Sequence, residues 1–394
     1  MRADSLGFDP DRRAILKAAA SMALASISRE TWALEAGEEL IDFADLDGYS
    51  VENGAENPRA KFFDLRRLTS WKTPQEDFFV FHQTRTVQAS VADWRLRIGG
   101  FVDKTRELTL DQIMQRTGRR ELAVTIECSG NSGYATANGQ VSNGVWTGVG
   151  LAPVLEECGL RPEAREVAFF GMDLEREHDA PAAAAHGRSL SVQDALDPNT
   201  MLAYRLNGSP LSPEHGFPLR LIVPGWYGMT QIKWLNRIEV LDRRYEGSHM
   251  ARNYHTIREL GTLDAGTVLE TSISKTRLKS VIARVTRRND TKGGYAYRIS
   301  GAAWGGPSPV KAVEVRVDGS AWRAARLGER GGDFAWSLWS IDWNDARPGP
   351  HAIVSRAIDV AAHLQPTSAE WQESVKSMRE DNSQWVRRIV IPSA

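Results

Sequence analysis

The segment Leu122-Ala123-Val124-Thr125-Ile126-Glu127-Cys128-Ser129-Gly130-Asn131-Ser132-Gly133 changes character at its middle. Its first half is largely apolar and rich in β-branched residues, which predicts a buried strand. Its second half consists of serine, glycine and asparagine, which form turns and let a ligand approach the backbone closely. The segment therefore predicts that the Cys128 thiol lies on a loop at the end of a strand, a favoured position for a functional site.

Cys128 on its own allows three interpretations. It could be a small buried hydrophobe, it could form a disulfide with Cys158, or it could bind a ligand. Cys158 lies on the apolar face of a helix predicted over Leu151–Cys158, and that helix ends at Gly159. We therefore expect Cys158 to lie in the core.

The cysteine count limits the cofactors that the chain can hold. Two cysteines cannot supply the four thiolates of an iron–sulfur cluster, and no Cys-x-x-Cys-His is present to attach a haem. The sequence also lacks the glycine-rich dinucleotide and phosphate-binding motifs, the G-x-S-x-G motif of hydrolases and the H-E-x-x-H zinc motif. It therefore predicts no haem and no iron–sulfur cluster, and leaves cofactors that need at most one cysteine.

The N-terminal residues are typical of a twin-arginine export signal, because Arg12 and Arg13 precede a short apolar run that continues to Ala25. An amphipathic N-terminal helix is the alternative. The run is far shorter than the roughly 20 residues that cross a bilayer, so we expect no stable membrane span. Proteins exported by this route generally fold first, often because a cofactor is inserted in the cytoplasm. The signal predicts a periplasmic protein, with cleavage after Ala25 or after Ser28.

The composition is that of an ordinary globular chain with room for two domains, since the 394 residues are 42% hydrophobic and 25% charged. The formal net charge of -1 gives no electrostatic footprint for nucleic acid or an anionic membrane surface. We therefore expect no nucleic-acid partner.

Three regions follow the signal. Residues 34–60 are acidic and polar and predict an extended lead-in, not a packed element. Residues 60–245 mix strand and helix patterns, which predicts an α+β domain, and the chain after residue 265 has short strands between turns, which favours a β-sandwich. The main predicted strands are Trp94–Ile98, Leu122–Ile126, Leu219–Val223, Val281–Thr286, Tyr295–Ala303, Val313–Val317, Ala335–Ser340 and Ala352–Ala357.

Several separate stretches resemble the sulfite oxidase family. Thr125–Asn131, followed by Trp146–Val149, resembles the region that carries the family's molybdenum ligand. The stretch from His215 to Leu235 resembles the family's second cofactor-binding segment, in the expected order and spacing. Motifs between Gly301 and Asp359 resemble the family's C-terminal dimerisation domain of immunoglobulin-like topology. The resemblance covers roughly residues 60 to 390.

This resemblance implies an α+β molybdopterin-binding catalytic domain over residues 34–260 and an all-β immunoglobulin-like dimerisation domain over 261–394, after the signal at 1–33. It also implies a homodimer. The implied cofactor is molybdenum held by the two dithiolene sulfurs of molybdopterin, with Cys128 as the single protein ligand. A soft thiolate suits that role.

The resemblance further implies which residues bind the pterin and its phosphate. Arginine and lysine can hold a phosphate, aspartate can accept from amino groups, and histidine can donate to an anionic oxygen. Arg220 could instead end a strand in solvent, and Lys233 could extend along Trp234. The implied cofactor-binding residues are Phe79, Val80, Phe81, His82, Gln83, Cys128, Asp173, His215, Arg220, Gln231, Ile232 and Lys233.

Tyr254 corresponds to the tyrosine that the family places beside the metal, where its phenol would orient substrate or assist a proton step. A surface-loop tyrosine is the alternative. Arg252 is the cation nearest to it in sequence, and Arg379 corresponds to the arginine that the C-terminal domain lends to the site. Cys128, Tyr254, Arg252 and Arg379 are thus the expected catalytic residues.

The chain departs from the family at positions that bear on the substrate. Phe81, Ser132 and Gly133 stand where sulfite oxidases usually carry arginines. A buried oxyanion needs compensating cations. Arg379 is the expected source of that charge; the other arginines that could supply it are Arg85, Arg188 and Arg252.

The expected function is oxidation of sulfite, or of a related small sulfur oxyanion, to sulfate. The expected electron acceptor is an external c-type cytochrome. A molybdenum-dependent reductase that removes oxygen from another substrate, such as a sulfoxide, is the alternative within the same fold. A binding subunit without catalytic activity is the alternative from a different class.

Overall fold

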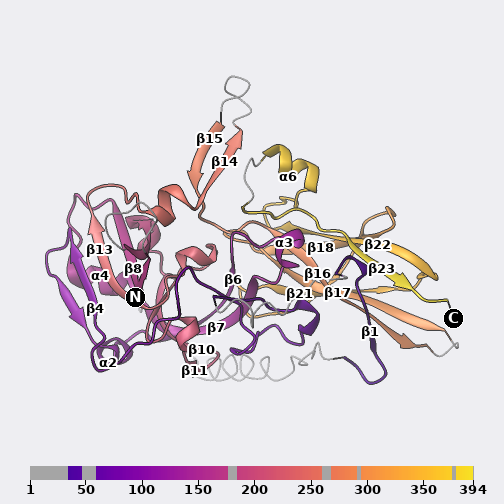
Figure 1. The fold of residues 1–394 in the computed structure, drawn as a ribbon, viewed down its shortest axis with the longest axis horizontal. Helices are drawn as coiled ribbons and strands as arrows, with labels where there is room; N and C mark the ends of the chain where they lie inside the picture. The colour runs from indigo at the N-terminus through magenta and orange to yellow at the C-terminus, as the bar shows by residue number, and fades with distance from the viewer. Residues whose placement is uncertain are drawn as a thin grey trace, which may run out of the picture.

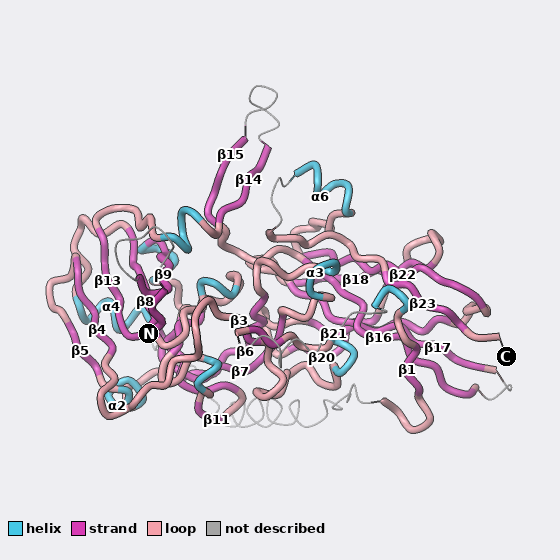
Figure 2. Tube along the Cα trace, in the orientation of Figure 1, coloured by secondary structure: helices cyan, strands magenta, loops and turns pink. Residues whose placement is uncertain are grey.

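A computed structural model describes residues 34–46, 59–175, 184–259, 268–290, 294–374 and 379–393. The predicted export signal at residues 1–33 lies outside this part of the chain. Strands dominate the described part, and the helices are short (Figure 2). The ribbon shows one group of strands around β4, β8 and β13, and a second, longer group around β16, β17, β18 and β22 (Figure 1).

The first group is a mixed five-stranded sheet with the order β5-β4-β13-β8-β9. Its β4 and β13 strands run parallel, whereas its other neighbours run antiparallel. The α4 helix contributes buried residues to the same core, among them Leu151, Val154 and Cys158. The elements are β4 (Leu96–Gly100), β5 (Arg106–Leu108), α2 (Leu110–Met114), α4 (Leu151–Cys158), β8 (Glu166–Glu175), β9 (Ala184–Ser191), α5 (Val192–Ala195) and β13 (Leu235–Leu241).

A second antiparallel sheet has the order β11-β10-β7-β6, and β12 pairs with β10. This sheet carries the Cys128 segment, because β6 ends at Glu127. The buried ring of Trp146 on β7 packs edge-on against Phe78, at 5.7 Å between ring centroids. The elements are β6 (Arg120–Glu127), α3 (Gly133–Thr136), β7 (Val141–Gly150), β10 (Met201–Leu206), β11 (Ser209–Pro210) and β12 (Arg220–Ile222).

The C-terminal part is a β-sandwich of two antiparallel sheets, with the orders β1-β16-β17-β21-β20 and β19-β18-β22-β23. Inward-facing side chains of both sheets form its core, with the buried rings of Trp339 and Trp343 among them. The elements are β1 (Glu39–Ile41), β16 (Lys279–Asn289), β17 (Tyr295–Trp304), β18 (Val310–Val317), β19 (Arg323–Ala324), β20 (Arg326–Arg330), β21 (Ser337–Trp343), β22 (Gly349–Asp359) and β23 (Arg387–Ile391).

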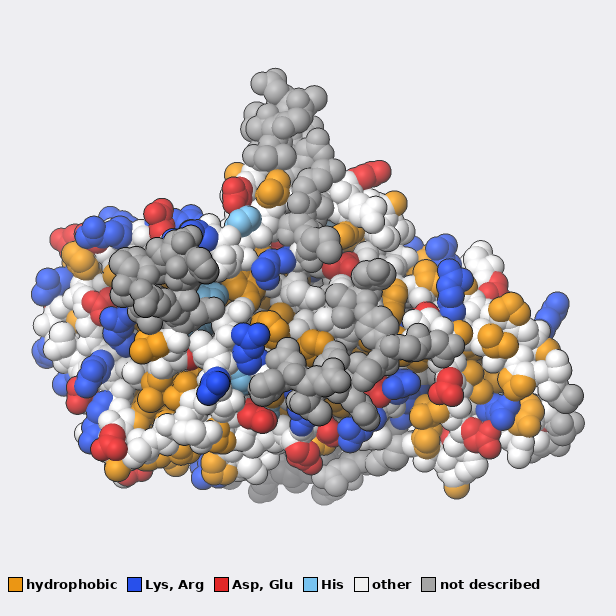
Figure 3. All heavy atoms as spheres, in the orientation of Figure 1, with side chains coloured by type: hydrophobic (Ala, Val, Ile, Leu, Met, Phe, Trp, Pro, Cys, Tyr) orange, Lys and Arg blue, Asp and Glu red, His pale blue; other side chains and the backbone are white. Residues whose placement is uncertain are grey.

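Smaller elements surround these sheets. The β14 and β15 strands form a hairpin that projects beside α6 (Figure 1). Among the described residues, no helix is both long enough and apolar enough to span a bilayer. Lys and Arg side chains are interspersed with Asp and Glu across the face in Figure 3. The elements are β2 (Ala60–Lys61), β3 (Val80–Phe81), β14 (His255–Glu259), β15 (Val268–Ser272) and α6 (Ser368–Ser374).

The predicted fold class, an α+β region followed by a β-sandwich, is confirmed. Gly159 ends α4 as expected, with a positive φ of 70°. Thr109 caps α2 through a capping box with Gln112. The expected lead-in over residues 34–60 was wrong in part. Glu39–Ile41 pairs with β16, and Phe43 is buried in the sandwich core, because pairing with a distant strand decides the structure of this short segment.

Candidate active site

The Cys128 turn is held by hydrogen bonds on both sides. The backbone N–H of Cys128 donates to the Gln140 carbonyl at 2.9 Å, and its carbonyl accepts from the Asn131 N–H at 3.0 Å. The Asn131 side-chain oxygen accepts from the Gln140 N–H at 3.0 Å and from the Thr136 hydroxyl at 2.9 Å. Backbone and side chain together therefore fix where the thiol lies relative to β6 and β7.

Cys128 lines a pocket between the strands of the molecule's N-terminal part. The pocket brings together ten residues that the sequence predicts for the site, namely Phe79, Phe81, His82, Gln83, Cys128, Asp173, Arg220, Gln231, Lys233 and Tyr254. Sequence reasoning did not assign four further lining residues, namely His186, Gly228, Met229 and Trp234.

Five predicted residues do not line this pocket. Val80 and Ile232 are buried, and Ile232 belongs to the core of the first sheet. His215 is also buried, and its Nε2 lies 2.9 Å from the Gln75 carbonyl. Arg252 is exposed. Arg379 lies next to the pocket, because its guanidinium carbon is 4.4 Å from the centroid of the Tyr254 ring.

Tyr254 is buried at the pocket wall, so the surface-loop alternative was wrong. Its hydroxyl accepts a hydrogen bond from the Gln83 amide at 2.8 Å. Burial raises the pKa of Tyr254, and the charge of Cys128 raises it further, whereas Arg379 lowers it. The phenol, the thiol and the Arg379 guanidinium therefore act on one another electrostatically.

The other candidate arginines point elsewhere. Arg188 is buried, and its guanidinium donates to the carbonyls of His249 and Ile273. Arg85 and Arg252 are exposed. Of the four candidate arginines, Arg379 is therefore the one that the described residues place against Tyr254.

Arg220 and Lys233 form the cationic wall of the pocket. Arg220 is only 5% exposed, so the solvent alternative was wrong, and burial lowers its pKa to about 9. Burial and the neighbouring Arg220 lower the pKa of Lys233 well below its ordinary value. Neither side chain forms an ion pair with a carboxylate among the described residues. Two such cations fit an anionic group such as a phosphate.

His186 was missed because it belongs to none of the quoted motifs. Its Nε2 lies 3.1 Å from the Met229 carbonyl, and its ring centroid is 4.3 Å from that of His249. Burial, with a contribution from His249, lowers the pKa of His186 to about 3, so the imidazole is neutral. The sequence signal that could have found Trp234 is its position directly after Lys233.

The two cysteines have separate environments. Both are free thiols, so the disulfide alternative was wrong, and Cys158 lies in the core as expected. Burial raises the pKa of the Cys128 thiol, while a hydrogen bond from the Gly130 backbone and the charge of Arg379 lower it. A bound cation of a soft metal would hold such a thiol in the thiolate form.

The packing around Gly133 accounts for the absence of an arginine at this position. A Cβ atom at this position would lie 2.3 Å from the ring of Trp385, closer than real contacts allow. A long cationic side chain therefore has no room at position 133 while Trp385 keeps its place.

Comparison with known proteins agrees with this geometry. Residues 82–249 match the family model described as "Oxidoreductase molybdopterin binding domain", and residues 270–392 match "Mo-co oxidoreductase dimerisation domain". These two matches place the chain among the molybdopterin-binding oxidoreductases. The chain belongs to the sulfite oxidase family of these enzymes.

Individual relatives share between a quarter and a third of the sequence. The chain is 33% identical to mitochondrial sulfite oxidase of Drosophila melanogaster, over 76% of this chain and 56% of that protein. It is 30% identical to nitrate reductase [NADH] 2 of Arabidopsis thaliana, over 76% of this chain and 36% of that protein. The chain therefore spans about half or less of the length of these relatives.

A solved structure shares the fold. A chain of the sulfane dehydrogenase SoxCD from Paracoccus pantotrophus superposes with a TM-score of 0.73 at 24% identity, covering 90% of this chain and 96% of that chain. The two-part architecture is therefore common to both.

Proposed function

We propose that this chain oxidises sulfite, or a related small sulfur oxyanion, to sulfate, with molybdenum-molybdopterin bound in the Cys128 pocket. The observation that carries this proposal is that the pocket combines a half-buried thiol, a buried arginine, a half-buried lysine and a buried tyrosine. The sulfite oxidase among the relatives supports the choice of sulfite. The reaction adds one water-derived oxygen atom to sulfite and releases two protons and two electrons.

The residues of the chain fit the proposed cofactor. Cys128 would be the protein ligand of the metal, Arg220 and Lys233 would hold the phosphate, and Asp173 would accept from the pterin amino groups. When bound, the cofactor would supply the two-electron redox chemistry. No protein side chain in the pocket offers an equivalent electron store.

Other residues would position the substrate. Arg379 would balance the charge of the oxyanion, because an anion buried without a cation is costly. The Tyr254 phenol, held by Gln83, would orient an oxygen of the substrate and share a proton with it. The aromatic rings of Phe79, Phe81 and Trp234 would exclude bulk water from the same pocket.

The remaining assignments belong to this proposal. An external c-type cytochrome would accept the electrons, and export by the twin-arginine route would place the protein in the periplasm. The domain boundaries at residues 33 and 260 also stay proposals, and the family matches lie on either side of the second one.

The test uses the full chain purified from a host that makes molybdopterin. We expect about one molybdenum per chain and sulfite-dependent reduction of cytochrome c, and we expect Cys128→Ser to lose both the metal signal and more than about 99% of the activity. Cys158→Ser is the matched control, because Cys158 lies in the core away from the pocket. A folded wild-type chain without molybdenum would refute the proposal, and so would equal activity in Cys128→Ser.

The nitrate reductases among the relatives favour a second candidate, the reductive removal of oxygen from an oxyanion or a sulfoxide. Assays with a reduced dye as electron donor and with nitrate or a sulfoxide as acceptor distinguish the two. Higher kcat/KM in that direction than for sulfite oxidation would favour the reductase.

A further inference from the structure

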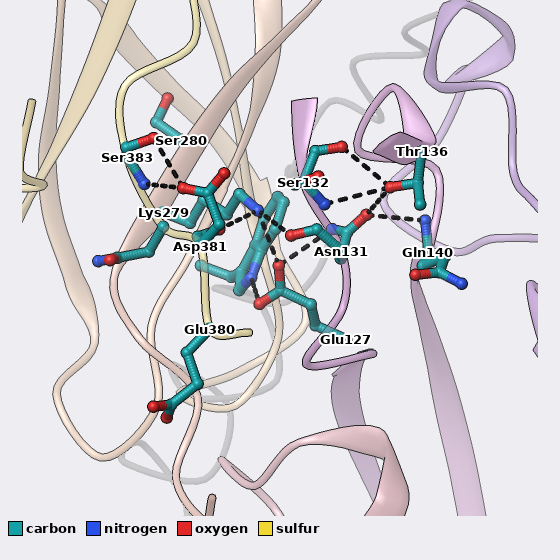
Figure 4. Close-up of polar contacts among 12 residues, drawn as sticks. Glu127, Asn131, Ser132, Thr136, Gln140, Lys279, Ser280, Glu380, Asp381 and Ser383 are labelled. Atoms are coloured by element: carbon teal, nitrogen blue, oxygen red, sulfur yellow. Dashed lines mark hydrogen bonds and ion pairs between the residues drawn. The ribbon is translucent and has the colours of Figure 1, made fainter. Parts of the chain in front are cut away.

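A buried ion pair lies directly behind the Cys128 turn. Lys279 and Glu127 are each only 2% exposed, and their charged atoms are 3.2 Å apart. Glu127 also accepts from the Trp304 indole at 2.8 Å and from the Asn131 amide at 3.0 Å. Because Glu127 directly precedes Cys128, this cluster ties the turn to β16 and β17 of the sandwich (Figure 4).

The Lys279 ammonium has all three of its donors engaged. Besides Glu127, it donates to the Asn131 carbonyl at 2.9 Å and to the Asp381 carbonyl at 2.8 Å. The first of these carbonyls belongs to the Cys128 turn, and the second belongs to the segment before β23 (Figure 4). Lys279 therefore joins two parts of the chain that are far apart in sequence.

The segment 379–385 contacts the same turn at further points. The Glu380 N–H donates to the Ser129 carbonyl at 2.7 Å. The Trp385 ring covers Gly133 so closely that a Cβ atom would not fit between them. Arg379, which lies over the Tyr254 ring, begins this segment. The position of the Arg379 guanidinium in the site thus depends on how the segment is attached to the turn.

Stability alone does not explain this buried charge pair. Replacing a buried ion pair by apolar groups of similar volume is often neutral or stabilising, since the desolvation of two charges is costly. Directional bonds from one ammonium to two separate backbone carbonyls instead specify a single geometry. The cluster is therefore suited to fixing distances.

We propose that Lys279 is a positioning residue that fastens the Cys128 turn to segment 379–385 and thereby holds the Arg379 guanidinium beside the Cys128 sulfur. The role of this arrangement in catalysis rests on the proposed function. Whether the Arg379 guanidinium lies near the Cys128 sulfur can be tested without any assumption about substrate or activity.

The experiment compares two thiol reagents on the full chain made in a host without molybdopterin. Iodoacetate is an anion and iodoacetamide is neutral, and both react with the thiolate of Cys128. The rate with iodoacetate divided by the rate with iodoacetamide therefore reports nearby positive charge, because the fraction of thiolate affects both rates equally. Peptide mapping by mass spectrometry separates Cys128 from Cys158. We expect Arg379→Met to lower the ratio about fivefold, as loss of one unit charge at close range predicts.

Lys279→Met is expected to lower the ratio by a similar factor. Because this variant leaves Glu127 buried without its cation, the charge-neutral pair Glu127→Gln with Lys279→Met is made alongside and is expected to behave in the same way. Adding Arg379→Met to Lys279→Met should lower the ratio no further, since Lys279 acts through Arg379. Arg284→Met, at a buried cation on the same strand, is the matched control and should keep the wild-type ratio.

Two results would overturn the proposal. One is a wild-type ratio of alkylation rates in the folded Glu127→Gln/Lys279→Met variant. The other is a further decrease in the ratio when Arg379→Met is added to Lys279→Met. In the cofactor-loaded chain, we expect the Mo(V) electron paramagnetic resonance spectrum to change in the pair variant and to stay unchanged in Arg284→Met. Failure of the proposed function would instead appear as a wild-type chain that binds no molybdenum or oxidises no sulfite, whatever the alkylation ratios are.

Discussion

Gly133 and Trp385 form a contact whose cost can be measured. The ring of Trp385 occupies the volume that a side chain at position 133 would need, because a Cβ atom added to Gly133 would lie 2.3 Å from the nearest ring carbon. We expect Gly133→Ala to lower the free energy of unfolding by about 1–3 kcal/mol, because overpacking forces neighbouring groups to move. Chemical denaturation measures this change.

A matched substitution and a rescue make the result specific. Gly150→Ala serves as the control, because its Cβ would meet its nearest neighbours at 3.4 Å, within the range that small shifts accommodate. In a chain that already carries Trp385→Ala, the substitution Gly133→Ala should lower the free energy of unfolding by less than it does in the wild-type chain. Equal stability of Gly133→Ala and wild type would show that the indole can move aside.

The sequence motifs selected residues that the fold brings together. Cys128, Arg220 and Tyr254 converge on one pocket although they are far apart in the chain. His186 was not predictable, because its place in the pocket depends on the pairing of β9 with β8 and not on its sequence neighbours. Arg252 was misplaced, because nearness to Tyr254 in sequence did not bring its side chain inward.

At the scale of single elements, β1 was the least predictable. Three residues with acidic neighbours carry too little periodicity to indicate a strand, and their partner β16 lies more than 200 residues later in the chain. The main strands of the sandwich were predictable because they are longer apolar runs between turns, as in β16 and β17. Tertiary pairing, not local propensity, therefore decides the short edge strand.

The attachment of β1 gives a prediction of its own. Phe43 is 2% exposed, and the Arg387 guanidinium lies 4.3 Å from its ring centroid. We expect Phe43→Ala to lower the free energy of unfolding by about 3–5 kcal/mol through loss of burial and the cavity that remains. Leu40→Ala, on β1 itself and 43% exposed, is the control and should change it by less than about 1 kcal/mol. Similar losses for both would mean that β1 is not packed as described.

A titratable pair joins β22 to the turn after β18. His351 Nδ1 lies 2.6 Å from Asp318, and the imidazole also lies edge-on to the Trp343 ring. Although burial opposes it, bonding to the Arg347 carbonyl and to Asp318 raises the pKa of His351. Hydrogen bonds from the Ala352 N–H and from His351 lower the pKa of Asp318, against the opposing effect of burial.

The signs of these shifts fix the pH dependence of stability. The raised pKa of His351 stabilises the fold at low pH and loses this contribution as pH rises through the folded-state pKa. The lowered pKa of Asp318 stabilises the fold above its unfolded pKa and loses this contribution as pH falls. We therefore expect His351→Gln to lower the thermal midpoint more at about pH 5.5 than at about pH 9, as measured by scanning calorimetry at one fixed, moderate salt concentration. An equal loss at both values would contradict the pairing.

At the scale of the whole molecule, the match of residues 270–392 to a dimerisation domain predicts a homodimer. We expect sedimentation equilibrium of the full chain to give twice the mass of one chain at micromolar concentration. Dimers of this kind commonly bury well over about 1,200 Å². A monomer at that concentration would show that the domain serves another purpose here.

The ties between segment 379–385 and the Cys128 turn carry a consequence for biosynthesis. During translation the turn emerges early, but the groups that brace it, from Lys279 to Trp385, leave the ribosome much later. A nascent chain that has folded its first domain therefore has all the residues that line the pocket but still lacks the groups that brace the Cys128 turn. The Cys128 turn is therefore fully braced only once synthesis has passed residue 385.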